Sequence, residues 1–269
     1  MSAMTPIAVT IAGSDSGGGA GIQADLKTFA ALGVYGASVI AALTAQNTQR
    51  VSAIHDVPAE FVAAQIDAVF SDLAVGAVKI GMLSRAPVIA AVAAGLDRWK
   101  ADNVVLDPVM VATSGDRLLA PDAIDALKRE LLPRARVVTP NLPEAAALLE
   151  TEIATDDDQM QAQAEGILAL GAQAVMIKGG HATGADSVDV LADGRSITRY
   201  AFKRIATRNT HGTGCTLSSA IAAGLAKGKD LALAVRHAKA YLSDAIAAAD
   251  RLAIGHGHGP VHHFHATWT

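Results

Sequence analysis

The sequence predicts an α/β fold with a mainly parallel central sheet, helices on both faces of the sheet and a small antiparallel edge. Three observations predict it. Short β-branched runs alternate with amphipathic stretches, which is the pattern of repeated strand–helix units. Several of these runs end in glycine or polar residues, as buried parallel strands do at the ligand-binding edge of such a sheet. Hydrophobic residues make up 51% of the 269 residues, enough for a sizeable core and too many for a disordered chain.

The first half of the chain contains four expected strands and three expected helices. The strands are expected at residues 7–13, 36–43, 77–80 and 103–106, and the helices at residues 23–32, 61–73 and 88–99.

The second half continues the alternation and adds a hairpin. Pro121 suits the first turn of a helix, and Asp193-Gly194 is a hairpin turn signal between two short strands. Helices are expected at residues 122–132, 143–149, 158–170, 214–226 and 231–252, and strands at residues 136–138, 174–177, 188–191 and 196–200.

Composition and organisation limit the classes of function. No linker-like stretch or internal repeat interrupts the chain, so residues 1–269 are expected to form a single domain. The net charge of −4 gives no basic excess, so we expect no nucleic-acid partner. We expect no membrane span, because no apolar run reaches about 18 residues without a charge or a glycine. The single cysteine and the absence of a secretory signal at the start favour a reducing compartment.

The first chemically informative segment is glycine-rich and lies between the first strand and the first helix, at residues 13–21. Glycines there allow close backbone approach to a ligand at a helix N-terminus. No Lys-Ser/Thr pair follows, so the segment is not a Walker A loop. Residues 19–24 match the dinucleotide pattern GxGxxA, but residues 44–47 (TAQN) provide no acidic residue after the second strand. A purely structural turn stays open as an alternative.

The second segment, residues 209–216, opens a helix near the C-terminus. Gly212 and Gly214 are expected to place backbone amides around an anion and to stabilise charge on a transferred group. Cys215 at a helix start is expected to have a lowered pKa. The alternatives are a nucleophilic Cys215 in acyl transfer and a small buried cap residue. His211 could serve as the base of the nucleophile, although no orienting carboxylate is evident in the sequence.

Three further segments follow expected strands. Asn141 and Glu144 offer an amide and a carboxylate that suit Mg²⁺, although Asn141 as a helix N-cap explains the same residues. Lys178, in a Lys-Gly-Gly-His run, could meet a phosphate. Asp107 ends another strand, and a buried carboxylate there needs a bound partner.

The C-terminal region is rich in histidine and glycine, which raises the possibility of a metal site. It lacks an HExxH helix and an obvious carboxylate or cysteine partner. A solvated tail that packs over the edge of the domain is therefore the preferred interpretation of His256, His258, His262, His263 and His265.

Taken together, these segments closely resemble the hydroxymethylpyrimidine/phosphomethylpyrimidine kinases of thiamine biosynthesis, which belong to the ribokinase-like superfamily. The resemblance extends from about residue 7 to residue 268 and is specific as a combination, although GTG-C and NxxE also occur in other vitamin kinases. It rests on the segments GSDSGGGAGIQADLKTF, TAQNT, KIGML, VLDPVMVATSGDRLL, TPNLPEA, IKGGH, NTHGTGCTLSSAIAA and GPVHHFH.

The resemblance implies a ribokinase-like three-layer αβα sandwich and two successive phosphoryl transfers from ATP. The first would phosphorylate the hydroxymethyl oxygen of 4-amino-5-hydroxymethyl-2-methylpyrimidine, and the second would extend the monophosphate to the diphosphate. It also implies Mg²⁺, a cytoplasmic location and a homodimer.

The resemblance also implies roles for individual residues. The pyrimidine-contacting glutamine corresponds to Gln46, and the other substrate-pocket positions correspond to Gly13, Asp25, Thr44, Met82 and Val109. The positions associated with Mg²⁺ correspond to Glu144 and Asn141, those for nucleotide to Lys178, Asn141 and Thr213, and those for the anion hole to Gly212, Gly214 and Cys215. Sugar kinases of the superfamily have an aspartate base where this chain has Cys215, so the proton acceptor is either the thiolate or, in the second step, the substrate phosphate.

Two alternative functions remain open on the sequence. A kinase of the same fold could act on pyridoxal or pyridoxine, which also present a hydroxymethyl group on a flat ring, although Gln46 and Met82 favour pyrimidine. A nicotinamide oxidoreductase or a catalytically silent binding module is the other. The missing acidic residue after the second strand argues against the oxidoreductase, and the set of Asn141, Glu144, Lys178 and Cys215 argues against the silent module.

Overall fold

The computed structural model describes residues 4–110, 119, 121–181 and 186–268. Residues 111–118, which belong to one of the segments on which the resemblance rests, lie outside the described residues.

A nine-stranded sheet with the order β3-β2-β1-β4-β5-β6-β7-β8-β9 forms the centre of the described structure. The six central strands, β2, β1, β4, β5, β6 and β7, pair in parallel. At the edges of the sheet, β3 pairs antiparallel with β2, and β8 pairs antiparallel with both β7 and β9. The predicted sheet is therefore confirmed. The strands are β1 Ile7–Asp15, β2 Tyr35–Gln46, β3 Val51–Asp56, β4 Ala77–Ile80, β5 Val104–Leu106, β6 Val137–Val138, β7 Val175–Lys178, β8 Asp186–Ala192 and β9 Ile197–Lys203.

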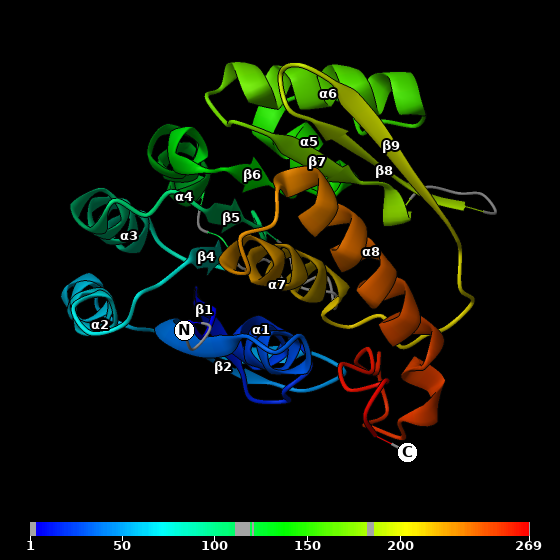
Figure 1. Ribbon diagram of the computed structural model, residues 1–269, viewed down its shortest axis with the longest axis horizontal. Coiled ribbons are helices and arrows are strands. Elements are labelled where there is room, and N and C mark those ends of the chain that lie inside the picture. Colours follow the sequence, from blue (N-terminus) through cyan, green and yellow to red (C-terminus); the bar gives the residue numbers. More distant parts are fainter. Residues whose placement is uncertain (1–3, 111–118, 120, 182–185, 269) are drawn as a thin grey trace.

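Helices cover both faces of the sheet, which gives three layers (Figure 1). On one face α7 packs against β1, β4 and β5 and against its neighbours α1 and α8, and on the other face α2 packs against β2 and α6 against β7 and β8. Two separate apolar clusters fill the spaces between the layers. The α-helices are α1 Gly21–Ala31, α2 Ala59–Phe70, α3 Ala86–Trp99, α4 Pro121–Ala126, α5 Leu142–Leu149, α6 Asp157–Ala169, α7 Thr213–Ala226 and α8 Leu231–Ala247.

The strand order reverses between β1 and β4, the two strands from which the chain runs to opposite edges of the sheet. Ligands of open α/β sheets bind in the crevice beyond the carboxyl ends of the strands at such a point. The topology thus places the glycine-rich segment after β1 and the residues after β4 and β5 around one crevice.

Three expectations about elements need correction. Strand β2 extends to Gln46, so Thr44 and Gln46 lie in the strand rather than after it, and the sequence did not predict β3 at all. The helix expected at residues 122–132 is α4 followed by a π-helical turn and a 3₁₀ turn that contains Pro133. The helix expected to end at residue 252 is α8, which ends at Ala247 and is followed by a 3₁₀ turn at Ala249–Arg251. The hairpin around Asp193-Gly194 is confirmed, since β8 and β9 pair across it.

Candidate active site

A cavity of about 680 Å³ lies at the carboxyl ends of the parallel strands. Its wall has three parts. One end is built by residues of β1, β2 and the turn after β4, the middle by residues that follow β5, β6 and β7 together with the start of α7, and the other end by residues of β8, β9 and α8.

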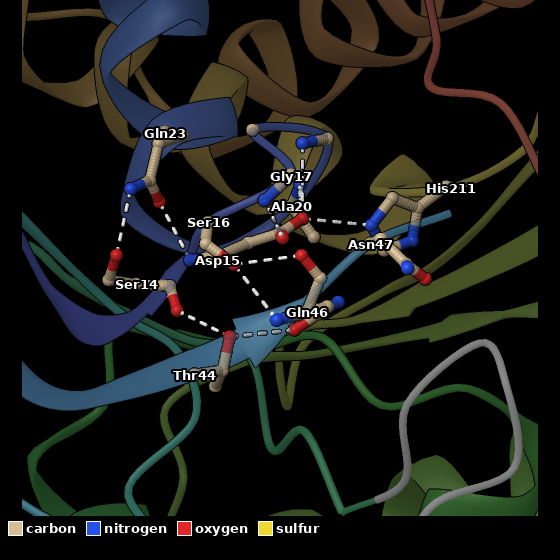
Figure 2. Close-up of polar contacts among 12 residues, drawn as sticks. Ser14, Asp15, Ser16, Gly17, Ala20, Gln23, Thr44, Gln46, Asn47 and His211 are labelled. Carbon is tan, nitrogen blue, oxygen red and sulfur yellow. Dashed lines mark hydrogen bonds and ion pairs between the residues drawn. The ribbon is translucent and has the colours of Figure 1, made fainter. Parts of the chain in front are cut away.

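The glycine-rich loop after β1 is organised by the buried carboxylate of Asp15. This carboxylate accepts hydrogen bonds from the backbone N–H groups of Gly17 (2.8 Å), Gly19 (3.1 Å) and Ala20 (2.9 Å), as Figure 2 shows in part. His211, which precedes α7, places its Nε2 2.9 Å from Asp15 Oδ2. Burial tends to raise the Asp15 pKa, but His211 and these amide donors hold it below its usual value. The orienting carboxylate for His211 that the sequence did not reveal is therefore Asp15.

The first end of the cavity includes Thr44 and Gln46 on β2. The Thr44 hydroxyl donates to the Ser14 carbonyl oxygen at 2.8 Å and lies 3.1 Å from Gln46 Oε1 (Figure 2). The Gln46 backbone is fixed by the Ser16 hydroxyl, which accepts from the Gln46 N–H at 2.8 Å. Gly13, Met82 and Val109 line the same cavity. A Cβ at Gly13 would lie 2.6 Å from Met82 Cε, so a glycine lets the methionine pack there.

The middle of the cavity holds two buried carboxylates, Asp107 and Glu144, and a half-buried lysine, Lys178. Lys178 Nζ lies 2.7 Å from Asp107 Oδ1 and 3.8 Å from Glu144 Oε2. Thr139 and Ser218 also donate hydroxyl hydrogen bonds to Asp107, which gives this carboxylate the bound partners that the sequence required. Burial raises the pKa of Glu144 to about 7, an effect that Lys178 reduces and Asp107 increases. Lys178, which is expected to meet a phosphate, thus lines the cavity and forms an ion pair with Asp107.

Asn141 and Glu144 form a capping box at the start of α5. The Glu144 N–H donates to Asn141 Oδ1 at 2.9 Å, and the Asn141 N–H donates to Glu144 Oε2 at 2.8 Å. The helix-start interpretation is therefore confirmed. Both residues also line the cavity, so the same pair presents oxygen atoms to a ligand.

The start of α7 faces the cavity through Gly212, Thr213, Gly214 and Cys215. Gly212 is the N-cap with a positive φ of 81°, and no side chain caps the helix. The Thr213 N–H donates to the Thr210 carbonyl oxygen at 3.3 Å, so the amides that this helix start offers to an anion are those of Gly214 and Cys215. A Cβ at Gly214 would lie 3.3 Å from Lys178 Nζ, which shows how closely the backbone approaches the charged centre.

The expected lowering of the Cys215 pKa is wrong. Burial raises the pKa of the thiol to about 11, and the carboxylates of Asp25 and Asp107 raise it further. The ammonium group of Lys79 and the N–H of Gly21 lower the pKa, but they offset only part of this increase. Cys215 is thus a neutral thiol near neutral pH. Its helix position alone does not activate it, since two carboxylates lie close by.

Asp25, which is expected to contact substrate, is not among the residues that line the cavity. Its side chain is fully buried and accepts from Thr10 (2.6 Å), Lys79 (2.9 Å) and Ser219 (2.6 Å). Lys79 itself lines the cavity. Burial alone would lower the Lys79 pKa, but the carboxylates of Asp25 and Asp107 raise it above its usual value. The sequence analysis missed Lys79, although a lysine within the apolar run of β4 was a usable signal.

The far end of the cavity was not predicted. Phe202, Leu242 and Ile246 give it an apolar wall, and Asp189 and Lys239 form a buried ion pair there. Asp189 also accepts from the N–H of Gly179 at 3.0 Å and so fixes the turn that follows Lys178.

The cavity suits a small cation only together with a ligand that brings further oxygens. Among the described residues there is no group of three or more His, Cys, Asp and Glu side chains placed to hold a metal ion. Mg²⁺ commonly binds through one or two carboxylates plus phosphate oxygens and water. Glu144, with a pKa raised by burial, is a carboxylate that a bound cation would stabilise in its charged form.

Two of the C-terminal histidines are not solvated, which corrects the expectation of a solvated tail. His262 and His263 are buried, and His263 Nε2 lies 3.1 Å from the Thr216 hydroxyl on α7.

In the part of the chain that the structure describes, no helix has the length and apolar character needed to span a membrane.

The three-layer fold, with an open helix start, a lysine and oxygen ligands at the carboxyl ends of the strands, defines a ribokinase-like phosphotransferase. The model of the phosphomethylpyrimidine kinase family matches residues 15–262, and the chain belongs to that family and is a kinase.

Individual relatives agree with this assignment. The chain is 65% identical over 265 residues to the hydroxymethylpyrimidine/phosphomethylpyrimidine kinase of Rhizobium meliloti (strain 1021), which covers 98% of this chain and 99% of the relative. The solved phosphomethylpyrimidine kinase of Clostridium difficile has a TM-score of 0.80 at 44% identity, covering 89% of this chain and 99% of its own. The pyridoxal kinase of Bacillus subtilis, solved as an ADP complex, has a TM-score of 0.89 at 37% identity, covering 97% and 98%.

Proposed function

We propose that the protein transfers a phosphoryl group from ATP to the hydroxymethyl oxygen of 4-amino-5-hydroxymethyl-2-methylpyrimidine and then to the resulting monophosphate, for thiamine biosynthesis. The observation that supports this proposal most directly is the order of groups along one cavity. Along the strand order of the sheet, the cavity has Gln46 on β2 at one end, Lys178 at the end of β7 with the start of α7 in the middle, and the apolar wall on β9 and α8 at the other end.

At the first end, Gln46 is proposed to recognise the aminopyrimidine edge. Its side-chain amide has both donor and acceptor atoms, as that edge requires. The Thr44 hydroxyl near Gln46 Oε1 restricts the orientation of the amide. Gly13, Met82 and Val109 would pack against the ring.

In the middle, the amides of Gly214 and Cys215 at the start of α7 are proposed to hold the transferred phosphoryl group. Phosphoryl transfer has a loose transition state, so catalysis depends on positioning and on neutralising charge more than on a strong base. Lys178 has three donors and could bind a phosphate oxygen while keeping one hydrogen bond to Asp107. Glu144 and Asn141 would hold Mg²⁺, which supplies charge neutralisation at the phosphates when it is bound.

At the far end, the apolar wall of Phe202, Leu242 and Ile246 is proposed to receive the nucleotide base. Thr213, which lines the cavity at the start of α7, is proposed to contact the nucleotide.

A coupled ADP-release assay with the pyrimidine alcohol, its monophosphate and pyridoxal tests the proposal directly. We expect turnover of both pyrimidines and slower turnover of pyridoxal. Pyridoxal is a second candidate substrate because of the close structural likeness to the Bacillus subtilis pyridoxal kinase. Turnover of pyridoxal alone would replace the proposed function by the second candidate, and turnover of none of the three would refute both.

We also propose a cytoplasmic homodimer. Strand β3 is an edge of the sheet and most of its residues are exposed, and an exposed edge strand offers unpaired backbone groups to a second chain. Light scattering on the purified protein should give twice the chain mass, and the monomer mass would contradict the proposal.

A further inference from the structure

The C-terminal glycine- and histidine-rich segment, residues 255–263, touches the loops that build the cavity, and the proposed chemistry does not account for it. Its first part lies against Thr48, which is two residues beyond Gln46. The His258 N–H donates to the Thr48 carbonyl oxygen at 3.0 Å, and the Gly257 N–H donates to the Thr48 hydroxyl oxygen at 3.1 Å. A Cβ at Gly257 would overlap the Thr48 carbonyl oxygen, so this approach requires a glycine.

The second part of the same segment lies against the residues before α7. The Gly259 N–H donates to Asn209 Oδ1 at 3.1 Å, and the His211 N–H donates to the Gly259 carbonyl oxygen at 3.0 Å. His211 and Pro260 form a parallel β-bridge. The segment thus spans from the loop after β2 to the residue just before Gly212.

The contact extends to the first glycine-rich loop through His211. Figure 2 shows its ring directed at the Asp15 carboxylate, which also binds the amides of that loop. Gly212 and Gly19 approach each other so closely that a Cβ at Gly212 would overlap the Gly19 carbonyl oxygen. One short segment therefore connects the three loops around the first end and the middle of the cavity.

We propose that residues 255–263 act as a strap that sets the position of the first end of the cavity, where the pyrimidine alcohol would bind, relative to the start of α7. Thr48 is the positioning residue of this strap. The inference rests on the proposed function, because it concerns the distance between the hydroxymethyl oxygen and the phosphoryl group. Reaction rates depend steeply on this placement, and a displacement of about 1 Å can cost about 100-fold. At its C-terminal end the strap also contacts α8, since the His262 N–H donates to the Ala245 carbonyl oxygen at 3.0 Å and the Tyr241 hydroxyl donates to the His263 carbonyl oxygen at 2.8 Å. The contact with Thr48 lies at the other end of the strap, beside the loop after β2.

Two Thr48 variants of the full-length protein separate positioning from folding. Thr48→Val removes the hydroxyl that accepts from Gly257 and keeps the side-chain shape, whereas Thr48→Ser keeps the hydroxyl. We expect Thr48→Val to lower kcat several-fold with the Kd for a non-hydrolysable ATP analogue unchanged, and Thr48→Ser to keep the wild-type kcat. Equal kcat in both variants and in the wild type would overturn the proposal that the strap positions the first end of the cavity.

Gly257→Ala provides a stronger displacement of the same contact. It should lower kcat about 10-fold or more at a temperature at which the variant is fully folded, again with nucleotide affinity retained. A folded Gly257→Ala protein with lower thermal stability and wild-type kcat would show a merely structural role and overturn the proposal. If Gly257→Ala does not fold, the Thr48 pair decides.

The wild-type assay keeps this test separate from that of the proposed function. If the wild type turns over pyridoxal but neither pyrimidine, the proposed function is refuted. The strap is then tested by measuring kcat of the same variants with pyridoxal as the substrate. If the pyrimidines are turned over and the Thr48 and Gly257 variants behave as the wild type does, only the strap fails.

Discussion

Gln46 is held at the end of β2 by contacts to its backbone and side chain, and its amide is proposed to pair with the pyrimidine edge. Gln46→Leu would leave polar atoms of the ring without partners and should weaken pyrimidine binding by roughly 1–3 kcal/mol. Calorimetric titration measures this loss. Gln49→Leu, at an exposed position outside the cavity wall, is the matched control and should bind as the wild type does. Unchanged affinity in Gln46→Leu would remove Gln46 from recognition.

Glu144 combines a structural and a proposed metal-binding role, and Glu144→Gln separates them. The glutamine can still accept from the Asn141 N–H and so keep the capping box, but it lacks the charge that a cation needs. We expect the Mg²⁺ concentration for half-maximal activity to rise about 10-fold or more, with the unfolding temperature little changed. Glu165→Gln on the exposed face of α6 is the control. A wild-type Mg²⁺ dependence in Glu144→Gln would leave Glu144 with its capping role only.

Cys215 should behave as a neutral thiol, because burial raises its pKa to about 11. Iodoacetamide should therefore alkylate it about 100-fold or more slowly than a free thiol at pH 7.5, since only the thiolate reacts. Cys215→Ala keeps the helix amides, so kcat for the alcohol should fall by less than about 10-fold. A loss of about 10²–10⁴-fold would instead identify the thiol as the proton acceptor.

Some residues of the site were predictable from the sequence and others were not. Asn141, Glu144 and Lys178 follow strands whose carboxyl ends meet, so sequence and topology together bring them to one place. The Asp15–His211 pair joins residues 196 apart in the chain, a contact that no local pattern reveals. Asp25 matched a family position, but only the fold shows that Lys79, Thr10 and Ser219 bind its fully buried carboxylate.

At the scale of elements, the buried parallel strands were predictable because apolar β-branched runs mark them. Strand β3 was missed because it lies at an exposed edge and its sequence, VSAIHD, has no clear apolar face. The break in the helix expected at residues 122–132 falls where the π-helical turn meets Leu132 and Pro133, in agreement with the tendency of proline to end a helix.

The start of α7 depends on Gly212 for both its conformation and its contact with the first glycine-rich loop. Gly212→Ala meets two penalties, a positive φ of 81° and overlap with the Gly19 carbonyl oxygen. Gly194→Ala, at the hairpin tip, meets only the first, since its φ is +75° and nothing lies within 4 Å. We expect Gly194→Ala to lower the free energy of unfolding by about 1–2 kcal/mol with full activity. Gly212→Ala should lose more stability and at least about 100-fold in kcat. Equal behaviour of the two variants in chemical unfolding and in the ADP-release assay would contradict this account.

At the scale of the whole molecule, the cavity is assembled from segments that span the chain from Ala12 to Ile246, and one sheet supports all of them. We infer that the chain is a single domain, because the strap, α7 and the first strand are joined by side-chain contacts such as His211–Asp15 and His263–Thr216. Chemical unfolding should accordingly follow one cooperative transition.

The buried His263 should make this global stability depend on pH. Burial is the largest cause that lowers its pKa, to about 3, and Lys27 and His262 lower it further. The unfolded chain has the ordinary value of about 6.5 and binds a proton first as the pH falls. Stability from this residue is therefore complete above about pH 6.5 and is lost toward pH 3. Between pH 7 and pH 5 the loss should be about 2 kcal/mol in the free energy of unfolding.

Urea unfolding of the wild type and of His263→Gln at both pH values isolates this contribution. The variant cannot take up the proton, so its free energy of unfolding should fall about 2 kcal/mol less than that of the wild type between pH 7 and pH 5. His256→Gln changes an exposed histidine of the same segment and should show the wild-type pH dependence. If wild type and His263→Gln lost the same free energy, His263 would be accessible to protons in the folded protein, and the packing of the strap onto Thr216 of α7 would be looser than the contacts in the structure require.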